Sequence, residues 1–129
     1  MSGARILDAS AVLALAAEEA GASRVRDLLL EGGCAITTVD LAEVATQMIL
    51  RGGKPERAER FCLSLGMEVL EVDQALAFQA AALALETRPL GLSLGGRLCL
   101  AAAMREAGTA VTADQVWVRV PGVQVEVIR

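Results

Sequence analysis

Histidine is absent from this 129-residue sequence, and aromatic residues make up only 2% of it. Without histidine the chain cannot build a Ser-His-Asp or Cys-His nucleophile. Any catalysis must therefore rest on carboxylates, hydroxyls, arginine or a metal ion. The scarcity of aromatic side chains leaves alanine, leucine and valine to fill the core, which suits close contacts between helices and a sheet.

Cysteine is also scarce, with three residues, Cys34, Cys62 and Cys99. They lie far apart within apolar stretches and form no Cys-x-x-Cys motif. The odd number and this spacing argue against a disulfide framework. Because histidine is missing too, a zinc site is not expected. We therefore predict that all three cysteines are buried core thiols.

No apolar run approaches the ~20 residues of a membrane-spanning helix. The N-terminus also lacks the basic region and apolar run of a signal peptide, so we expect a cytoplasmic protein without membrane contact. Hydrophobic residues nevertheless make up 54% of the chain, above the usual level. This excess predicts that part of the surface is buried against a partner.

Positive charge is in deficit, since the net charge at pH 7 is −4. That balance argues against a protein that binds nucleic acid through bulk electrostatics. Four basic residues nevertheless cluster within ten positions: Arg51, Lys54, Arg57 and Arg60. They predict either a solvated helix face, which is the simpler interpretation, or a local patch that contacts phosphates.

Short apolar strands alternate with helical segments along the chain. Strands are expected over residues 5–7, 34–38, 67–72 and 109–112 and around 123–128, and helices over 11–20, 22–31, 39–51, 55–66, 74–88 and 93–107. This alternation, with few hairpin signals and short connections, predicts an α/β sandwich with a parallel sheet. No repeat or linker divides the sequence, so we expect a single domain over residues 1–129.

Two aspartates directly follow predicted strands, Asp8 after the first and Asp114 after the strand TAVT. The carboxyl ends of parallel strands form the crevice where ligands bind in open α/β folds, so both should project at one sheet edge. Each has an alternative structural role. Asp8 is a possible N-cap for the helix near Ser10, although Ser10 is suited to that role itself, and Asp114 is a possible turn residue.

Glu43 lies one turn into the helix that follows the second strand. This position points its carboxylate toward the strand ends, but Asp40 and Glu43 also resemble a capping box. Asp73 follows the third strand in a similar context, and a helix-capping role explains it fully. Three acids that converge at strand ends repel one another unless a cation is present. Mg²⁺ or Mn²⁺ suits such carboxylates, which predicts a metal-dependent phosphodiesterase.

Three stretches carry a resemblance to a known family: RILDASAVLAL, TTVDLAEVATQM and LSLGGRLCLAAAMREAGTAVTADQVW. Together they resemble PIN-domain ribonucleases, and among these the VapC toxins of bacterial toxin–antitoxin pairs. The resemblance implies a three-layer α/β/α sandwich and RNA cleavage with Mg²⁺ or Mn²⁺. It also implies a homodimer and a cognate antitoxin that inserts a segment over the active site. Such antitoxins are small DNA-binding proteins, so operator DNA would be contacted only through the antitoxin.

The resemblance also implies roles for particular residues. Asp8, Glu43 and Asp114 match metal-binding acids of the family, Thr112 matches the hydroxyl residue before the last acid, and Arg97 matches a basic residue beside the third acid. The sequence departs from the family at that third acid, because Gly96 stands where an aspartate is expected.

Local physics also favours an acid at this position. If Ser93 caps the helix, residue 96 is N3, where an acid complements the helix dipole, whereas glycine costs up to ~1 kcal/mol. We therefore expect a ribonuclease whose activity is impaired. The glycine would then be an engineered change, a spontaneous inactivating mutation or a mark of a naturally degenerate copy. The alternative is a catalytically inactive PIN-fold module that still pairs with an antitoxin. A phosphoacceptor receiver domain is set aside, because it needs an acidic pair near the first strand and a lysine after the last strand. Here only Asp8 stands near the first strand, and the single lysine, Lys54, lies in the middle of the chain.

Overall fold

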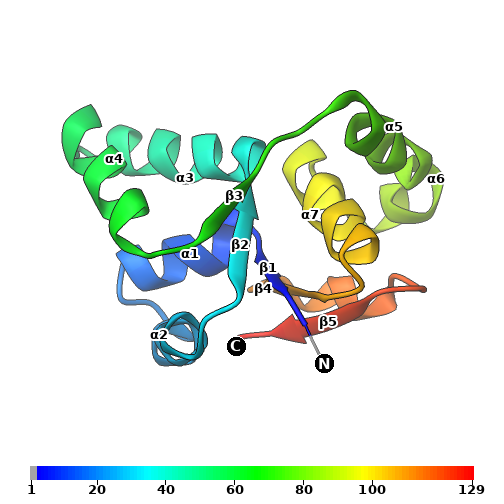
Figure 1. Ribbon diagram of the computed structural model, residues 1–129, viewed down its shortest axis with the longest axis horizontal. Coiled ribbons are helices and arrows are strands. Elements are labelled where there is room, and N and C mark those ends of the chain that lie inside the picture. The colour runs from blue at the N-terminus through cyan, green and yellow to red at the C-terminus, as the bar shows by residue number, and fades with distance from the viewer. Residues whose placement is uncertain (1–2) are drawn as a thin grey trace.

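The computed structural model describes residues 3–129, whose strands form one sheet in the order β3-β2-β1-β4-β5 (Figure 1). The strands are β1 (Arg5–Leu7), β2 (Cys34–Thr37), β3 (Glu68–Leu70), β4 (Thr109–Thr112) and β5 (Gln124–Val127). Every neighbouring pair is parallel. The predicted parallel sheet is therefore confirmed, and the carboxyl ends of all its strands meet at one edge.

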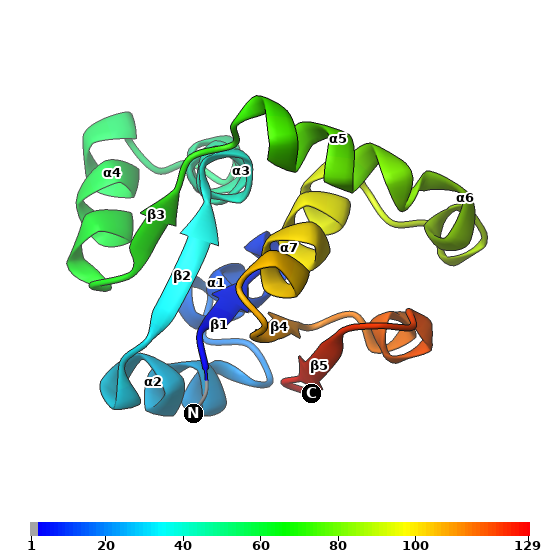
Figure 2. The same ribbon diagram turned by 45° about the vertical axis from the view of Figure 1, so that its right-hand side comes forward.

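Helices cover both faces of this sheet. They are α1 (Ala9–Ala16), α2 (Ala22–Glu31), α3 (Thr38–Leu50), α4 (Pro55–Ser64), α5 (Gln74–Ala82), α6 (Ala84–Thr87) and α7 (Leu94–Arg105), with two 3₁₀ turns, η1 (Arg88–Leu90) and η2 (Gln115–Arg119). Helices α1 to α4 lie on one side and α5 to α7 on the other, which gives the three-layer α/β/α sandwich (Figures 1 and 2).

The strands supply one core to each face, because successive side chains of a strand point to opposite sides. Ile6 of β1 and Ala110 of β4 pack with α5 and α7. Their neighbours Leu7 and Val111 pack instead with α1, α2 and α3. Burial on both faces explains why these strands are apolar throughout, as parallel strands usually are. The three cysteines are buried free thiols, as predicted.

Several boundaries differ from the sequence expectation. The first helix ends at Ala16 rather than at residue 20, because the backbone leaves the helical conformation by Glu18, whose φ is 53°. The expected long helix over 74–88 is interrupted at Leu83, which turns its side chain into the core. The third strand is shorter than expected because it is an edge strand and pairs with β2 alone.

A close approach at Gly108 sets β4 beside β1. A Cβ atom at this position would overlap the carbonyl oxygen of Ala4, so only glycine allows the chain to turn from α7 into β4 here. The turn brings the end of β4 next to the end of β1, where Asp114 and Asp8 follow. No helix among residues 3–129 has the length and apolar character needed to span a membrane.

Candidate functional site

An open cavity of about 660 Å³ lies at the carboxyl edge of the sheet. Its walls come from the residues after β1 and β4, one face of α3 along its whole length, the N-terminal parts of α1 and α7, and the loop before α7. Four of the lining residues are acidic: Asp8, Asp40, Glu43 and Asp114. The structure therefore brings the three acids selected from the sequence into one cavity and adds a fourth.

Asp8 lies at the end of β1 and accepts several hydrogen bonds there. It is the N-cap of α1, and its Oδ1 accepts a hydrogen bond from the Ala11 amide at 2.9 Å. The hydroxyl of Thr112 donates to its Oδ2 at 2.8 Å, and the Ser10 hydroxyl lies 2.8 Å from its Oδ1. Burial raises the pKa of Asp8, and these hydrogen bonds oppose that shift. The capping role and the place in the cavity therefore coexist.

Two hydroxyl groups tie the end of β4 to the end of β1. The fully buried Thr112 bonds to Asp8 and accepts a hydrogen bond from the Asp114 amide at 3.1 Å. The Ala113 amide donates to Ser10 Oγ at 2.9 Å. Asp114 itself is exposed and caps η2 through the Val116 amide. Sequence analysis assigned Ser10 only to helix capping and missed that it links Asp8 to the residue after β4. Its position two residues after Asp8 was the sequence signal for this contact.

Glu43 is exposed on α3, and the Gln47 side-chain amide donates to its Oε2 at 3.2 Å. The capping-box interpretation of Asp40 and Glu43 is wrong. The helix begins at Thr38, and its N-cap is Thr37, whose Oγ1 accepts a hydrogen bond from the Asp40 amide at 3.1 Å. Asp40 is therefore N3, and Glu43 lies beyond the first turn.

Asp40 is the acid that sequence analysis missed as a candidate site residue. Only 2% of its surface is exposed, and its Oδ2 has no hydrogen-bond partner within residues 3–129. Burial raises its pKa to about 8, helped by repulsion from Asp8 and Glu43 and opposed by the Ala9 amide. The available signal was its spacing of three residues from Glu43, which places both on one face of α3.

The first turn of α7 forms the opposite wall of the cavity. Ser93 is the N-cap and accepts a hydrogen bond from the Gly96 amide at 3.1 Å, so the predicted N3 position of residue 96 is confirmed. A Cβ atom at Gly96 would lie 3.1 Å from Cζ2 of the buried Trp117. An aspartate here therefore requires the indole to shift by a few tenths of an ångström.

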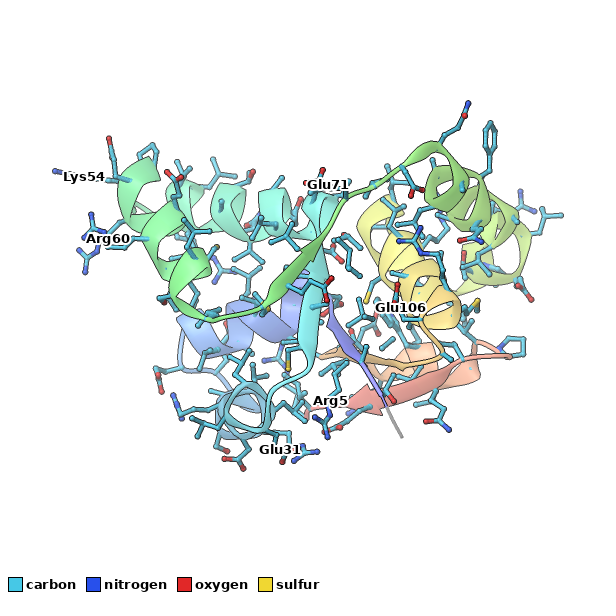
Figure 3. The ribbon with its side chains drawn as sticks, viewed as in Figure 1. Arg5, Glu31, Lys54, Arg60, Glu71 and Glu106 are labelled. Carbon is cyan, nitrogen blue, oxygen red and sulfur yellow. The ribbon has the colours of Figure 1, made fainter. Side chains whose placement is uncertain are left out.

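The basic residues divide between the cavity and other places. Arg97 is not among the lining residues, and its Nη1 donates instead to the Ala80 carbonyl of α5 at 3.3 Å. Arg51 lines the cavity at the end of α3. Lys54 and Arg60 are exposed and project outward at the far side of α4, as Figure 3 shows, and Arg57 is exposed nearby. Asp73, assigned to helix capping, does cap α5 through the Leu76 amide.

A family model of the PIN domain matches residues 5–123 of the sequence. The chain belongs to the PIN-domain family. A search of curated protein sequences finds no match.

Solved structures show the same fold over the whole chain. A chain of a toxin–antitoxin complex from Klebsiella pneumoniae superposes with a TM-score of 0.75 and 20% identity, and the match covers 98% of both chains. DNA-bound VapBC from Salmonella typhimurium superposes with a TM-score of 0.74 and 18% identity, and the match covers 99% of this chain and 100% of the other. VapBC2 from Rickettsia felis, bound to a promoter DNA fragment, superposes with a TM-score of 0.69 and 22% identity. That match covers 95% of this chain and 96% of the other.

The donor set of this PIN domain suits a hard divalent cation, because it consists of carboxylate and hydroxyl oxygens. Within residues 3–129, no three acidic or cysteine side chains already stand in metal-ligand positions. Asp8 instead accepts hydrogen bonds from its hydroxyl donors, Glu43 from Gln47, and Asp114 from the Val116 amide. The unpartnered oxygen of buried Asp40 nevertheless fits a site that a cation completes.

Proposed function

We propose that this PIN-domain protein is the toxin of a toxin–antitoxin pair and hydrolyses RNA phosphodiester bonds with Mg²⁺ or Mn²⁺. The observation that carries the proposal is the acid-lined cavity at the carboxyl edge of the sheet. Four carboxylates in one cavity repel one another, and two of them are buried with raised pKa values. A bound cation removes that repulsion, and a phosphate group is the substrate to which such a cation contributes most.

In this proposal, Asp8, Glu43 and Asp114 hold the cation. The cation would supply positive charge that stabilises the charge developing on the scissile phosphate. Thr112 and Ser10 keep the Asp8 carboxylate oriented through their hydroxyl groups, since both bond to it directly. Arg51 at the rim supplies positive charge toward an RNA backbone. Arg97 acts differently from the family expectation, because its guanidinium joins α7 to α5.

Two partners belong to this proposal. The solved structures with the same fold include two DNA-bound VapBC complexes and another toxin–antitoxin complex. These complexes support a cognate antitoxin here. We further propose that operator DNA is contacted only through that antitoxin. Large apolar side chains also remain exposed, among them Leu30 at 82% and Leu85 at 77%. Their exposure supports surfaces that an antitoxin and a second copy of the chain cover.

A second candidate is a PIN-fold module that no longer cleaves but still binds an antitoxin. Gly96 favours it, because the position of the family's third acid carries no side chain and the Trp117 ring packs against it. Catalysis separates the two candidates. In the active protein, Asp8 is essential whatever residue stands at position 96.

The test is RNA cleavage by the purified 129-residue chain with Mg²⁺ and with Mn²⁺. Asp8→Ala serves as the blank, and Asp73→Asn serves as the matched control, because it removes one carboxylate charge outside the cavity. Cleavage by the parent and by Asp73→Asn that exceeds the blank supports the ribonuclease. Cleavage no greater than the blank in the parent and in Gly96→Asp would exclude the ribonuclease and leave the binding module.

A further inference from the structure

The carboxyl group of Asp40 is placed unlike the other acids of the cavity. It lies in the first turn of α3, is 98% shielded from solvent and has an Oδ2 that meets no donor among residues 3–129. The capping of α3 does not need it, because Thr37 fills that role. Burying a carboxyl oxygen without a partner is costly, and the two charged groups that act on it, Asp8 and Glu43, are negative. Structural stability therefore does not explain this residue.

The start of α7 leaves room for Asp40. Helices α3 and α7 pack against each other, and both begin at the carboxyl edge of the sheet (Figure 2). A Cβ atom at Gly95 would stand 2.5 Å from the Asp40 Oδ1, so a larger residue there would displace the carboxyl group. Gly96, the next residue, lines the same cavity and adds no side chain to it. The carboxyl of Asp40 thus faces the helix turn on which the family's third acid is expected.

We propose that Asp40 is a cation ligand in this chain and supplies, from α3, the carboxylate that Gly96 does not supply from α7. This inference rests on the proposed metal-dependent function. The cavity keeps four carboxylates, with one of them moved to the facing helix. The buried, unpaired Oδ2 is the atom that gains a partner when the cation binds. Gly96 then marks a relocation of the acid and not a loss of the site.

Mn²⁺ binding to the full chain tests this directly, with free Mn²⁺ measured by electron paramagnetic resonance. Asp40→Asn keeps the shape of the side chain and removes its charge. It should weaken Mn²⁺ binding by at least about 10–100-fold, because losing a ligand should cost no less than losing a group that only orients one. Asp73→Asn is the matched control and should bind Mn²⁺ as the parent does. Circular dichroism confirms that each variant is folded.

A second variant tests the relocation. Adding Gly96→Asp to Asp40→Asn should recover at least about tenfold in Mn²⁺ affinity, because it returns a carboxylate to the opposite wall. If the parent binds Mn²⁺ and Asp40→Asn binds it with an affinity within about threefold of the parent's, this inference is overturned and the proposed function still stands. A double variant no tighter than Asp40→Asn would also overturn it. A parent that binds no Mn²⁺ would overturn both the inference and the proposed metal-dependent function.

Discussion

Replacing Asp40 with asparagine should stabilise the metal-free protein, and the gain should grow as the pH rises from about 4 to about 8. Asparagine has nearly the same shape and cannot ionise, so the substitution removes only the ability of this buried side chain to lose a proton. In the parent, burial raises the pKa of Asp40 from 3.8 to about 8. The folded protein therefore holds this proton over a pH range in which the unfolded chain has already released it.

The direction of the effect follows from that difference. Because the folded state binds the proton more tightly, the contribution of Asp40 to stability is fully present below about pH 4. It is lost as the pH rises toward about 8, and it is constant above that value. One pKa unit corresponds to about 1.4 kcal/mol. The free energy of unfolding of Asp40→Asn, relative to the parent, should thus rise by about 3 kcal/mol between pH 5 and pH 7.

Urea unfolding in the presence of EDTA measures this difference at several pH values for both proteins. Asp73→Asn is again the control. The pKa of Asp73 is lowered, first by its hydrogen bond from the Leu76 amide, so its contribution changes only below its ordinary value. The difference between Asp73→Asn and the parent should therefore be flat over the same range. An equally flat difference for Asp40→Asn would refute the reasoning, because it would mean that the folded protein ionises Asp40 normally.

Four further outcomes are expected. Gly96→Asp should bind Mn²⁺ more tightly and cleave RNA faster than the parent, and equal cleavage by both proteins would contradict this. The fluorescence of Trp117, the single tryptophan, should also change, because the new Cβ would lie 3.1 Å from its ring. Thr112→Val should lower the free energy of unfolding by about 1–3 kcal/mol in urea, because buried Asp8 loses a donor at 2.8 Å. An unchanged midpoint would show that this hydroxyl contributes nothing. Light scattering at micromolar concentration should find a dimer, and a monodisperse monomer would count against it. The cognate antitoxin should raise the melting temperature, and no shift would count against that partner.

The sequence by itself determined the features that depend on local order along the chain. Apolar strands that alternate with helices lead to a parallel sheet, since crossover helices leave no other simple pairing. Once the sheet is parallel, residues that follow strands must meet at one edge, which is why Asp8 and Asp114 line the same cavity. The capping of α7 by Ser93 and of α5 by Asp73 was also predictable, because a cap bonds only to its own helix.

Only the tertiary structure decided what surrounds each acid. The spacing of Asp40 and Glu43 fitted a capping box, but it could not show that Asp40 is buried and Glu43 exposed. Burial depends on α3 packing against α7, where Gly95 admits the Asp40 carboxyl. Arg97 turned to Ala80 because the neighbouring helix offers a carbonyl within reach. Desolvation and repulsion are sums over groups distant in sequence, so the raised pKa of Asp40 exists only once three helices converge on one sheet edge.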